Sequence, residues 1–139
     1  MRFHIITIFP KIFDPYFSQS IMARAFKKHI LSVRFFNPRN FTANKHKKVD
    51  DRPYAGGPGM VMTAEPILKA FERIKKTYKL QTKNYKIIIF SPRGKKFTNI
   101  YARNLAKNYS NVVLVCGRYE GIDARVKKIL HAEEISTGD

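Results

Sequence analysis

Two short segments, at residues 86–90 and 112–115, constrain the fold of this chain most strongly; the first is apolar after Lys86 and the second is apolar throughout. Uninterrupted apolar strands of this length are typical of parallel sheets that are covered on both faces. The other expected elements are strands at 2–9 and 31–36 and near 132–136, and helices at 20–29, after residue 63, at about 98–108 and at about 122–130. Strands and helices thus alternate along the chain, which predicts an α/β fold: a mostly parallel sheet with helices on both faces.

The helix expected after residue 63 has the clearest amphipathic pattern in the chain. Thr63 is a plausible N-cap because a hydroxyl can accept from the first free backbone N–H groups of a helix. Beyond it, apolar residues recur at helical spacing and form one stripe: Ile67, Phe71, Ile74 and Tyr78. A stripe of this width predicts a helix that packs on the core, so we assign these residues to structure and not to a ligand.

Both apolar strands are expected to end in a tight polar loop, at residues 91–94 and 116–121. Ligands of open α/β sheets bind outside the carboxyl ends of the strands. The glycines and prolines of these loops would let backbone groups approach a flat ligand, such as an adenine ring, closely. The pattern allows equally that these residues only form turns.

A third candidate lies in the long segment 38–62, which is polar and then rich in Gly and Pro. Loops of this length are usually functional or mobile. A flipped base could stack on Tyr54 while Arg52 contacts a phosphate; the alternative is a self-contained Ω-loop held by its Asp residues, Asp50 and Asp51. The basic run that includes Lys45 is either a phosphate contact or a solvated tip.

The charge of the chain favours a polyanionic partner. It has 27 Lys and Arg against 10 Asp and Glu, a net charge of +17, and residues 1–50 hold ten of the bases and two of the acids. Nucleic acid is the commonest partner for such a surface. A generally lysine-rich composition is the alternative.

Several other classes of site have no support in the sequence. It lacks a Gly-x-Gly-x-x-Gly run after the first strand, a phosphate-binding P-loop and a Gly-x-Ser-x-Gly nucleophile turn. The histidines do not form a metal-ligand spacing with Cys116, so no metal is expected. The single cysteine and the lack of a long apolar run predict a cytoplasmic protein that does not enter a membrane.

Six motifs occur in order along nearly the whole chain. They are Ile-Phe-Pro at 8–10 with Phe13, Asn-Pro-Arg-Asn-Phe-Thr at 37–42, Val-Asp-Asp-Arg-Pro-Tyr at 49–54 with Gly-Gly-Pro-Gly-Met at 56–60, Ser-Pro-Arg-Gly at 91–94, Cys-Gly-Arg-Tyr-Glu-Gly-Ile-Asp at 116–123, and Glu-Glu-Ile-Ser-Thr-Gly-Asp at 133–139. Together they resemble the signature of the tRNA (guanine-N1)-methyltransferase family, TrmD.

The resemblance implies a SPOUT-type trefoil-knot methyltransferase domain that works as a homodimer. The implied reaction moves a methyl group from S-adenosylmethionine to N1 of the guanine just 3′ of the anticodon of a tRNA. The family's cofactor-binding positions match these residues: Ser91, Pro92, Gly117, Tyr119, Glu120, Gly121, Thr137, Gly138 and Asp139. The expected RNA contacts are Lys45, Arg52 and Tyr54. Glu120 would offset the sulfonium charge, or would simply be a carboxylate at a helix N-terminus.

The sequence departs from the family pattern at three positions and at its end. Arg93, Ala55 and Thr137 stand where Gln, Gly and an aliphatic residue are expected. Family members continue past residue 139 through a segment that completes the knot and carries the presumed general base, and then into a tRNA-binding domain. Residues 1–139 are therefore expected to be a truncated cofactor-binding domain with an incomplete knot, no assigned catalytic residue and weak cofactor affinity. The alternative is an inactive RNA-binding or dimerisation fragment of the same fold.

Overall fold

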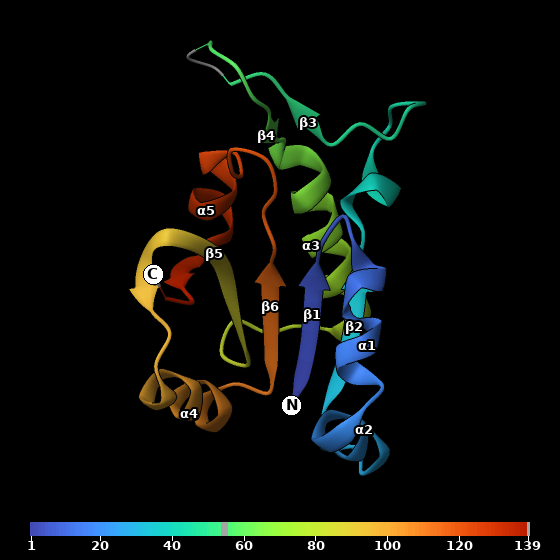
Figure 1. Cartoon of the computed structure of the whole chain (residues 1–139), viewed down its shortest axis with the longest axis vertical. Coiled ribbons are helices and arrows are strands. Elements are labelled where there is room, and N and C mark those ends of the chain that lie inside the picture. The colour runs from blue at the N-terminus through green and yellow to red at the C-terminus, as the bar shows by residue number, and fades with distance from the viewer. Residues whose placement is uncertain (54–55, 139) are drawn as a thin grey trace.

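Five strands form the central sheet in the computed structural model, which describes residues 1–53 and 56–138. Their spatial order is β2-β1-β6-β5-β7, and every neighbouring pair is parallel. The strands are β1 (Arg2–Ile6), β2 (Ser32–Phe36), β5 (Tyr85–Lys96), β6 (Asn111–Val115) and β7 (Glu133–Ser136). The predicted α/β fold with a mostly parallel sheet is confirmed (Figure 1).

Helices connect the strands, as parallel pairing requires. They are the 3₁₀-helices η1 (Pro10–Phe13) and η2 (Pro38–Phe41), and the α-helices α1 (Asp14–Phe17), α2 (Ser20–Lys27), α3 (Ala64–Tyr78), α4 (Asn99–Asn108) and α5 (Ala124–Leu130). The longer helices begin within two residues of their predicted positions, because the apolar periodicity marks them clearly.

The larger core lies on the face of the sheet that α3 and α5 cover. Ile67 and Ile74 of α3 and Val126 of α5 are fully buried there against Ile6 and Val113. Burying one such side chain contributes about 1.5–3 kcal/mol. The stripe predicted for α3 is therefore core, as expected.

Thr63 stands at the N-cap position of α3 but does not cap the helix with its side chain. Its Oγ1 donates instead to the carbonyl oxygen of Val49 at 3.2 Å, and its N–H donates to the same oxygen at 2.9 Å. The expected capping role was wrong, because the hydroxyl joins the two ends of the 49–63 segment.

The opposite face of the sheet carries a smaller core. Leu105 of α4 packs on Ile88 and Val112. Farther along, the ring of Phe35 lies 5.3 Å from that of Phe13 and 6.0 Å from that of Phe17, in η1 and α1. Helices thus lie on both faces, as predicted.

Strand β5 does not end where the sequence suggested. The expected break at residues 91–94 was wrong: the strand continues to Lys96 and curves along β7 (Figure 1). Ile135 of β7 pairs with both Phe90 and Lys95, so residues 91–94 form a bulge between two paired limbs. The strand can resume because Gly94 has no side chain: a Cβ there would lie 2.5 Å from the backbone nitrogen of Ile135.

Part of the long 38–62 segment forms a short antiparallel ladder, which the sequence did not predict. Strand β3 (Asp50–Asp51) pairs with β4 (Val61–Met62). Figure 1 shows this ladder beyond the carboxyl ends of β1 and β6. The segment that was expected to face a base therefore lies at the edge of the sheet where ligands bind.

Candidate functional site

Three segments meet at the carboxyl edge of the sheet and are called here the carboxyl-edge loops. They are the bulge 91–94 of β5, residues 116–121 after β6, and residues 137–138 after β7. The three strands are parallel neighbours with β5 in the middle, so their carboxyl ends share one edge. The predicted pocket residues of 91–94 and 116–121 therefore follow neighbouring strands at one edge, and those at 137–138 follow the strand on the other side of β5.

The 116–121 loop is held by the returning limb of the long segment. The backbone N–H of Glu120 donates to the carbonyl oxygen of Met60 at 3.0 Å, and that of Met62 donates to the carbonyl of Gly121 at 3.0 Å. The N–H of Asp123 donates in turn to the carbonyl oxygen of Met62 at 2.9 Å. Residues 60–62 and 120–123 therefore form one hydrogen-bonded unit, which could not be found from the sequence.

The backbone of the carboxyl-edge loops is open to a ligand at several points. Tyr119 is 44% exposed and has a φ of +61°, a left-handed conformation that costs a non-glycine residue about 1 kcal/mol or more. Gly121 and Gly138 have φ values of +134° and +129°, and no atom lies within 4 Å of the place where a Cβ would stand. A planar ring can therefore approach the main chain at both glycines.

The bulge and the neighbouring glycine complete this edge. Ser91 is half-buried, and its Oγ accepts from the N–H of Arg93 at 3.3 Å, while Pro92 is exposed. Gly117 is tightly packed, since a Cβ there would lie 3.2 Å from Cγ1 of Ile122. Of the predicted site residues in the first two loops, Pro92, Gly117, Tyr119 and Glu120 are therefore exposed, and Ser91 and Gly121 are half-buried.

Gly59 and Glu120 touch across the two segments. A Cβ at Gly59 would lie 2.6 Å from Cγ of Glu120 and 3.1 Å from its Oε1, so the carboxylate rests against the glycine. The alternative role of Glu120 as a helix N-terminal carboxylate is wrong, because α5 begins at Ala124 and Asp123 is its N-cap. A dipole effect is limited to the first turn, so the Glu120 carboxylate remains available to the site.

Asp123 is a structural carboxylate. Its Oδ1 accepts from the N–H of Arg125 at 2.9 Å, which caps α5, and its Oδ2 lies 2.6 Å from Nη2 of the same arginine. The hydrogen bonds from Arg125 hold the pKa of Asp123 below its ordinary value. A carboxylate that is paired in this way is a poor general base.

Cys116 stands at the start of the 116–121 loop but is not activated. Burial raises the pKa of its thiol to about 11, so the thiolate is scarce at neutral pH. Among residues 1–53 and 56–138, no three His, Cys, Asp or Glu side chains gather as metal ligands would.

Two of the expected RNA contacts are on the surface of the described part of the chain. Lys45 and Arg52 are exposed, and the N–H of Arg52 donates to Oδ1 of Asp51 at 2.8 Å. Tyr54, like the pocket residue Asp139, lies outside the described residues. An unpredicted cation lies close by: the guanidinium of Arg118 is 5.6 Å from the centre of the Phe9 ring.

Thr137 lines an apolar hollow of about 290 Å³ on the second face of the sheet. None of the other predicted pocket residues that the structure describes lines this hollow. Phe90, Phe97 and Leu114 line the same hollow. Sequence reasoning missed Phe90, although its place as the last apolar residue before the 91–94 motif was a usable signal.

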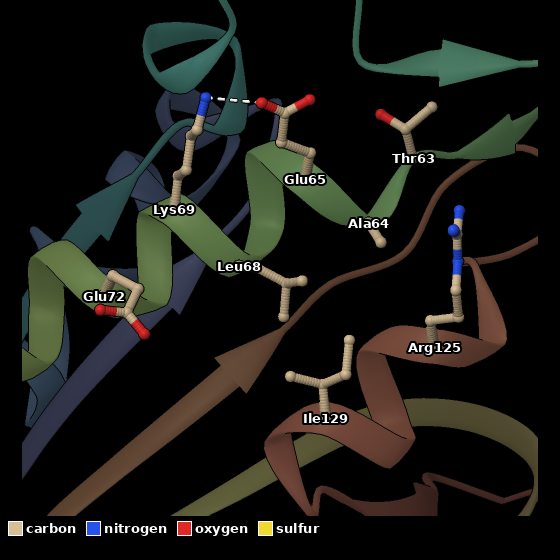
Figure 2. Close-up of a pocket in the computed structure, with 8 residues that line it drawn as sticks. All are labelled: Thr63, Ala64, Glu65, Leu68, Lys69, Glu72, Arg125 and Ile129. Carbon is tan, nitrogen blue, oxygen red and sulfur yellow. Dashed lines mark hydrogen bonds and ion pairs between the residues drawn. The ribbon is translucent and has the colours of Figure 1, made fainter.

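A separate groove of about 460 Å³ lies between α3 and α5 (Figure 2). Leu68 and Ile129 face one another across it, and its rim carries the ion pair between Lys69 and Glu65, at 2.6 Å. Arg125, on the opposite wall, is bound to Asp123. We assign this groove no part in the site, because it lies between two helices and three of its charged residues, Glu65, Lys69 and Arg125, are engaged in ion pairs.

Within the described parts of the chain, none of the helices has both the length and the apolar character needed to cross a bilayer.

Comparison with known proteins gives a single consistent answer. Residues 1–139 match the family model described as tRNA (Guanine-1)-methyltransferase TrmD. The tRNA (guanine-N(1)-)-methyltransferase of Clostridioides difficile is 46% identical over 142 residues, covering 100% of this chain and 59% of that protein. The protein of the same name from Buchnera aphidicola subsp. Acyrthosiphon pisum is 46% identical over 136 residues, covering 98% of this chain and 56% of its own length.

A solved structure matches as well. The crystal structure of tRNA (m1G37) methyltransferase from Aquifex aeolicus superposes with a TM-score of 0.86 and 38% identity, over 100% of this chain and 60% of that one. The chain thus spans between half and three fifths of the length of these relatives.

Proposed function

The chain belongs to the tRNA (guanine-1)-methyltransferase TrmD family, and from that premise we propose that it is part of an enzyme that methylates N1 of a guanine in tRNA. The methyl donor is S-adenosylmethionine, and the target is the guanine just 3′ of the anticodon. Residues 1–139 form the donor-binding domain of the SPOUT class. The observation that carries the proposal is that the carboxyl-edge loops follow three neighbouring parallel strands, with accessible main chain at Gly121 and Gly138.

The residues present fit S-adenosylmethionine. Open backbone at Gly121 and Gly138 suits the adenine and ribose, which need hydrogen bonds from main-chain groups and little side-chain bulk. Ser91, Pro92 and Gly117 add further backbone at the same edge, and Tyr119 adds an exposed ring. When bound, S-adenosylmethionine supplies a sulfonium methyl group as the electrophile.

We assign Glu120 the role of placing a negative charge near the sulfonium group of the donor. Its carboxylate is exposed at the edge and braced by Gly59, so it can lie near a positively charged sulfur without being buried. A fixed negative charge favours a sulfonium ligand over its neutral demethylated product. The hydrogen-bonded 60–62 segment keeps that carboxylate in place.

Orientation is the main contribution of this chain to the reaction. The acceptor nitrogen must lie in line with the transferred methyl group at near-attack distance. Residues 60–62, which include β4, are joined to residues 120–123 by three backbone hydrogen bonds, so the ladder of β3 and β4 sets the distance between a bound base and the donor. Guanine N1 must also lose a proton, and Asp123 is unsuited to accept it. We assign no general base within residues 1–138.

The charge of the chain supports tRNA as the partner. A net charge of +17 favours a polyphosphate backbone; Lys45 and Arg52 are exposed, and Arg52 directly follows β3. Tyr54 remains the candidate for stacking on the target base.

We further propose that the protein works as a homodimer in the cytoplasm, where its tRNA substrate is found. Large apolar side chains that are exposed on the single chain support self-association: Ile12, Tyr16, Ile21 and Ile100 are between 64 and 73% exposed. Sedimentation of the purified protein tests this, and a monomer at micromolar concentration would contradict it.

The decisive experiment is a methyl-transfer assay with radiolabelled S-adenosylmethionine and tRNA transcripts. It is run with the 139-residue chain and with the protein encoded by the complete gene. We expect the gene product to methylate a transcript with guanine at the target position and to leave an adenine-substituted transcript unlabelled. Equal labelling of both transcripts would refute the proposed specificity.

A further inference from the structure

A charged cluster lies at the root of the β5 bulge, outside the carboxyl-edge loops themselves. Its centre is the carboxylate of Glu133, at the start of β7. Nζ of Lys86 lies 2.7 Å from its Oε2, the hydroxyl of Tyr101 donates to the same oxygen at 3.1 Å, and Nζ of Lys95 lies 3.4 Å from its Oε1. Three different elements, β5, α4 and β7, meet at this one side chain.

The two lysines belong to the two limbs of β5. Lys86 stands in the first limb, before the bulge, and Lys95 stands where the second limb begins. Because Lys86 and Lys95 both contact Glu133, its carboxylate links the two limbs of β5 on either side of the 91–94 bulge. The second limb then continues along β7, where the N–H of Phe97 donates to the carbonyl oxygen of Ser136 at 2.7 Å.

The contacts differ in strength. The side chains of Lys86 and Glu133 are 29% and 20% exposed, so their pair is only partly screened by solvent. Lys95 is 80% exposed, and its longer contact contributes little. The hydrogen bond from Lys86 also holds the pKa of Glu133 below its ordinary value, so the carboxylate is charged at neutral pH.

From this geometry we propose that Glu133 is a positioning residue for the methyl-donor site. It holds the two limbs of β5 against β7 and thereby fixes Ser91 and Pro92 relative to Thr137 and Gly138. It does not contact the donor itself, because it lies at the start of β7, four residues before Thr137 and beneath both residues 91–92 and residues 137–138. The inference rests on the proposed function, since it takes residues 91–92 and 137–138 to bind S-adenosylmethionine.

The test compares Glu133→Gln with Glu134→Gln. Glutamine keeps the size of the side chain and its ability to accept from Tyr101, but it removes the charge that binds Lys86. Glu134 is the matched control, because it is the next residue of the same strand and its side chain pairs at 2.6 Å with Lys127 of α5, and not with a lysine of β5. Tyr101→Phe is a second variant that removes a single hydrogen bond and is expected to fold.

Two readouts are needed, both on the protein from the complete gene. The first readout is the hydrogen-exchange rate of the backbone amides of residues 95–97, which can be measured without any bound ligand. Calorimetry follows the binding of S-adenosylmethionine and of S-adenosylhomocysteine. For Glu133→Gln we expect about tenfold faster exchange at Phe97 and about tenfold weaker binding, the change that loss of one partly exposed charged hydrogen bond produces.

Kinetics separate positioning from simple loss of stability. Glu133→Gln should raise the KM for the donor while the KM for tRNA stays within twofold, Tyr101→Phe should show a smaller change in the same direction, and Glu134→Gln should show neither effect. A lower melting temperature with unchanged donor affinity would overturn the inference, as would equal effects of the two glutamine variants. Failure of the wild-type protein itself to bind the donor is a different result, because it refutes the proposed function.

Discussion

The backbone N–H of Glu120 donates a 3.0 Å hydrogen bond to the carbonyl oxygen of Met60, and this bond joins two segments that lie far apart in the sequence. One segment carries the expected base-facing residues and the other carries most of the expected donor-binding residues. Two more backbone bonds, from Met62 and Asp123, extend the junction. A change at the ladder of β3 and β4 should therefore alter the affinity of the donor site for S-adenosylmethionine.

Substitution of Gly59 by Ala tests this coupling. The new methyl group would stand 2.6 Å from Cγ of Glu120, and the residue would keep a φ of +101°, so we expect weaker binding of S-adenosylmethionine as Glu120 is displaced. The backbone strain alone should lower the free energy of unfolding by about 1–2 kcal/mol.

Gly56→Ala is the matched control for that variant. Gly56 also has a positive φ, +76°, but no atom lies within 4 Å of its Cβ position. It should lose similar stability while donor affinity stays unchanged by calorimetry. If both alanine variants bind the donor like the wild type, Glu120 is not braced by Gly59 in solution.

The sequence predicted most of the fold because apolar periodicity carries that information. The strands around 86–90 and 112–115 and the stripe of α3 are confirmed. The end of β5 could not be predicted, since Ser-Pro-Arg-Gly reads as a turn. Only the packed structure shows that Gly94 lets the chain pass close to the backbone of Ile135 and resume pairing.

The site was predictable in part for the same reason. The loop at 116–121 follows directly from the end of β6, and residues 91–94 follow the apolar run of β5 although they form a bulge within the strand; the parallel order brings both to one edge. The junction between residues 60–62 and 120–123 left no signal, because backbone hydrogen bonds do not depend on side-chain identity. The left-handed conformation of Tyr119 was hidden as well, since a tyrosine rarely adopts it.

Arg52→Ala should weaken binding of tRNA without changing donor affinity. Arg52 is exposed beside the carboxyl edge, where its charge can meet a phosphate. Loss of one phosphate contact should lower the slope of log affinity against log salt by about one. Arg73→Ala, on the outward face of α3, removes the same charge at a distance from the edge and is the control. Equal losses for both variants, measured by filter binding at several salt concentrations, would indicate only a general effect of net charge.

His4 should make the chain less stable as the pH falls from about 7 to 5. Its ring is fully buried beside Tyr78, with the ring centres 4.3 Å apart, and its Nε2 lies 3.2 Å from Oδ1 of Asn111. Burial lowers the pKa of His4 below its ordinary value of 6.5. The unfolded chain therefore binds more protons than the folded chain as the pH drops below about 6.5, and stability decreases by at most about 1.4 kcal/mol per pH unit.

Urea unfolding of the wild type and of His4→Gln at pH 7.5 and 5.5 measures this effect. The variant should be less stable at pH 7.5, but its midpoint should change less between the two pH values. The carboxylates with lowered pKa values, Asp123 and Glu133, lose their contribution only at more acidic pH. A wild-type midpoint that is the same at both pH values would contradict the prediction.

Cys116 should react slowly with a thiol reagent such as dithionitrobenzoate. With a thiol pKa of about 11, only a small fraction is thiolate at pH 8. Against an unfolded cysteine of pKa about 8.5, the native rate should be lower by about two orders of magnitude. Since the chain has one cysteine, the native and guanidinium-unfolded rates compare the same group directly. Comparable rates in the two states would mean that the thiol is not buried as described.

Gly94→Ala should open the junction between β5 and β7. The added Cβ would lie 2.5 Å from the backbone nitrogen of Ile135 and 2.6 Å from the carbonyl carbon of Glu134, and neither backbone atom can move aside cheaply. We expect a loss of about 2–3 kcal/mol in the free energy of unfolding, together with faster hydrogen exchange along β7. Lys96→Ala, on the exposed second limb of the same strand, should change stability by no more than about 0.5 kcal/mol and serves as the control. If Gly94→Ala is as stable as Lys96→Ala, the bulge tolerates a side chain at this point and the close approach of the two strands is not what allows β5 to continue.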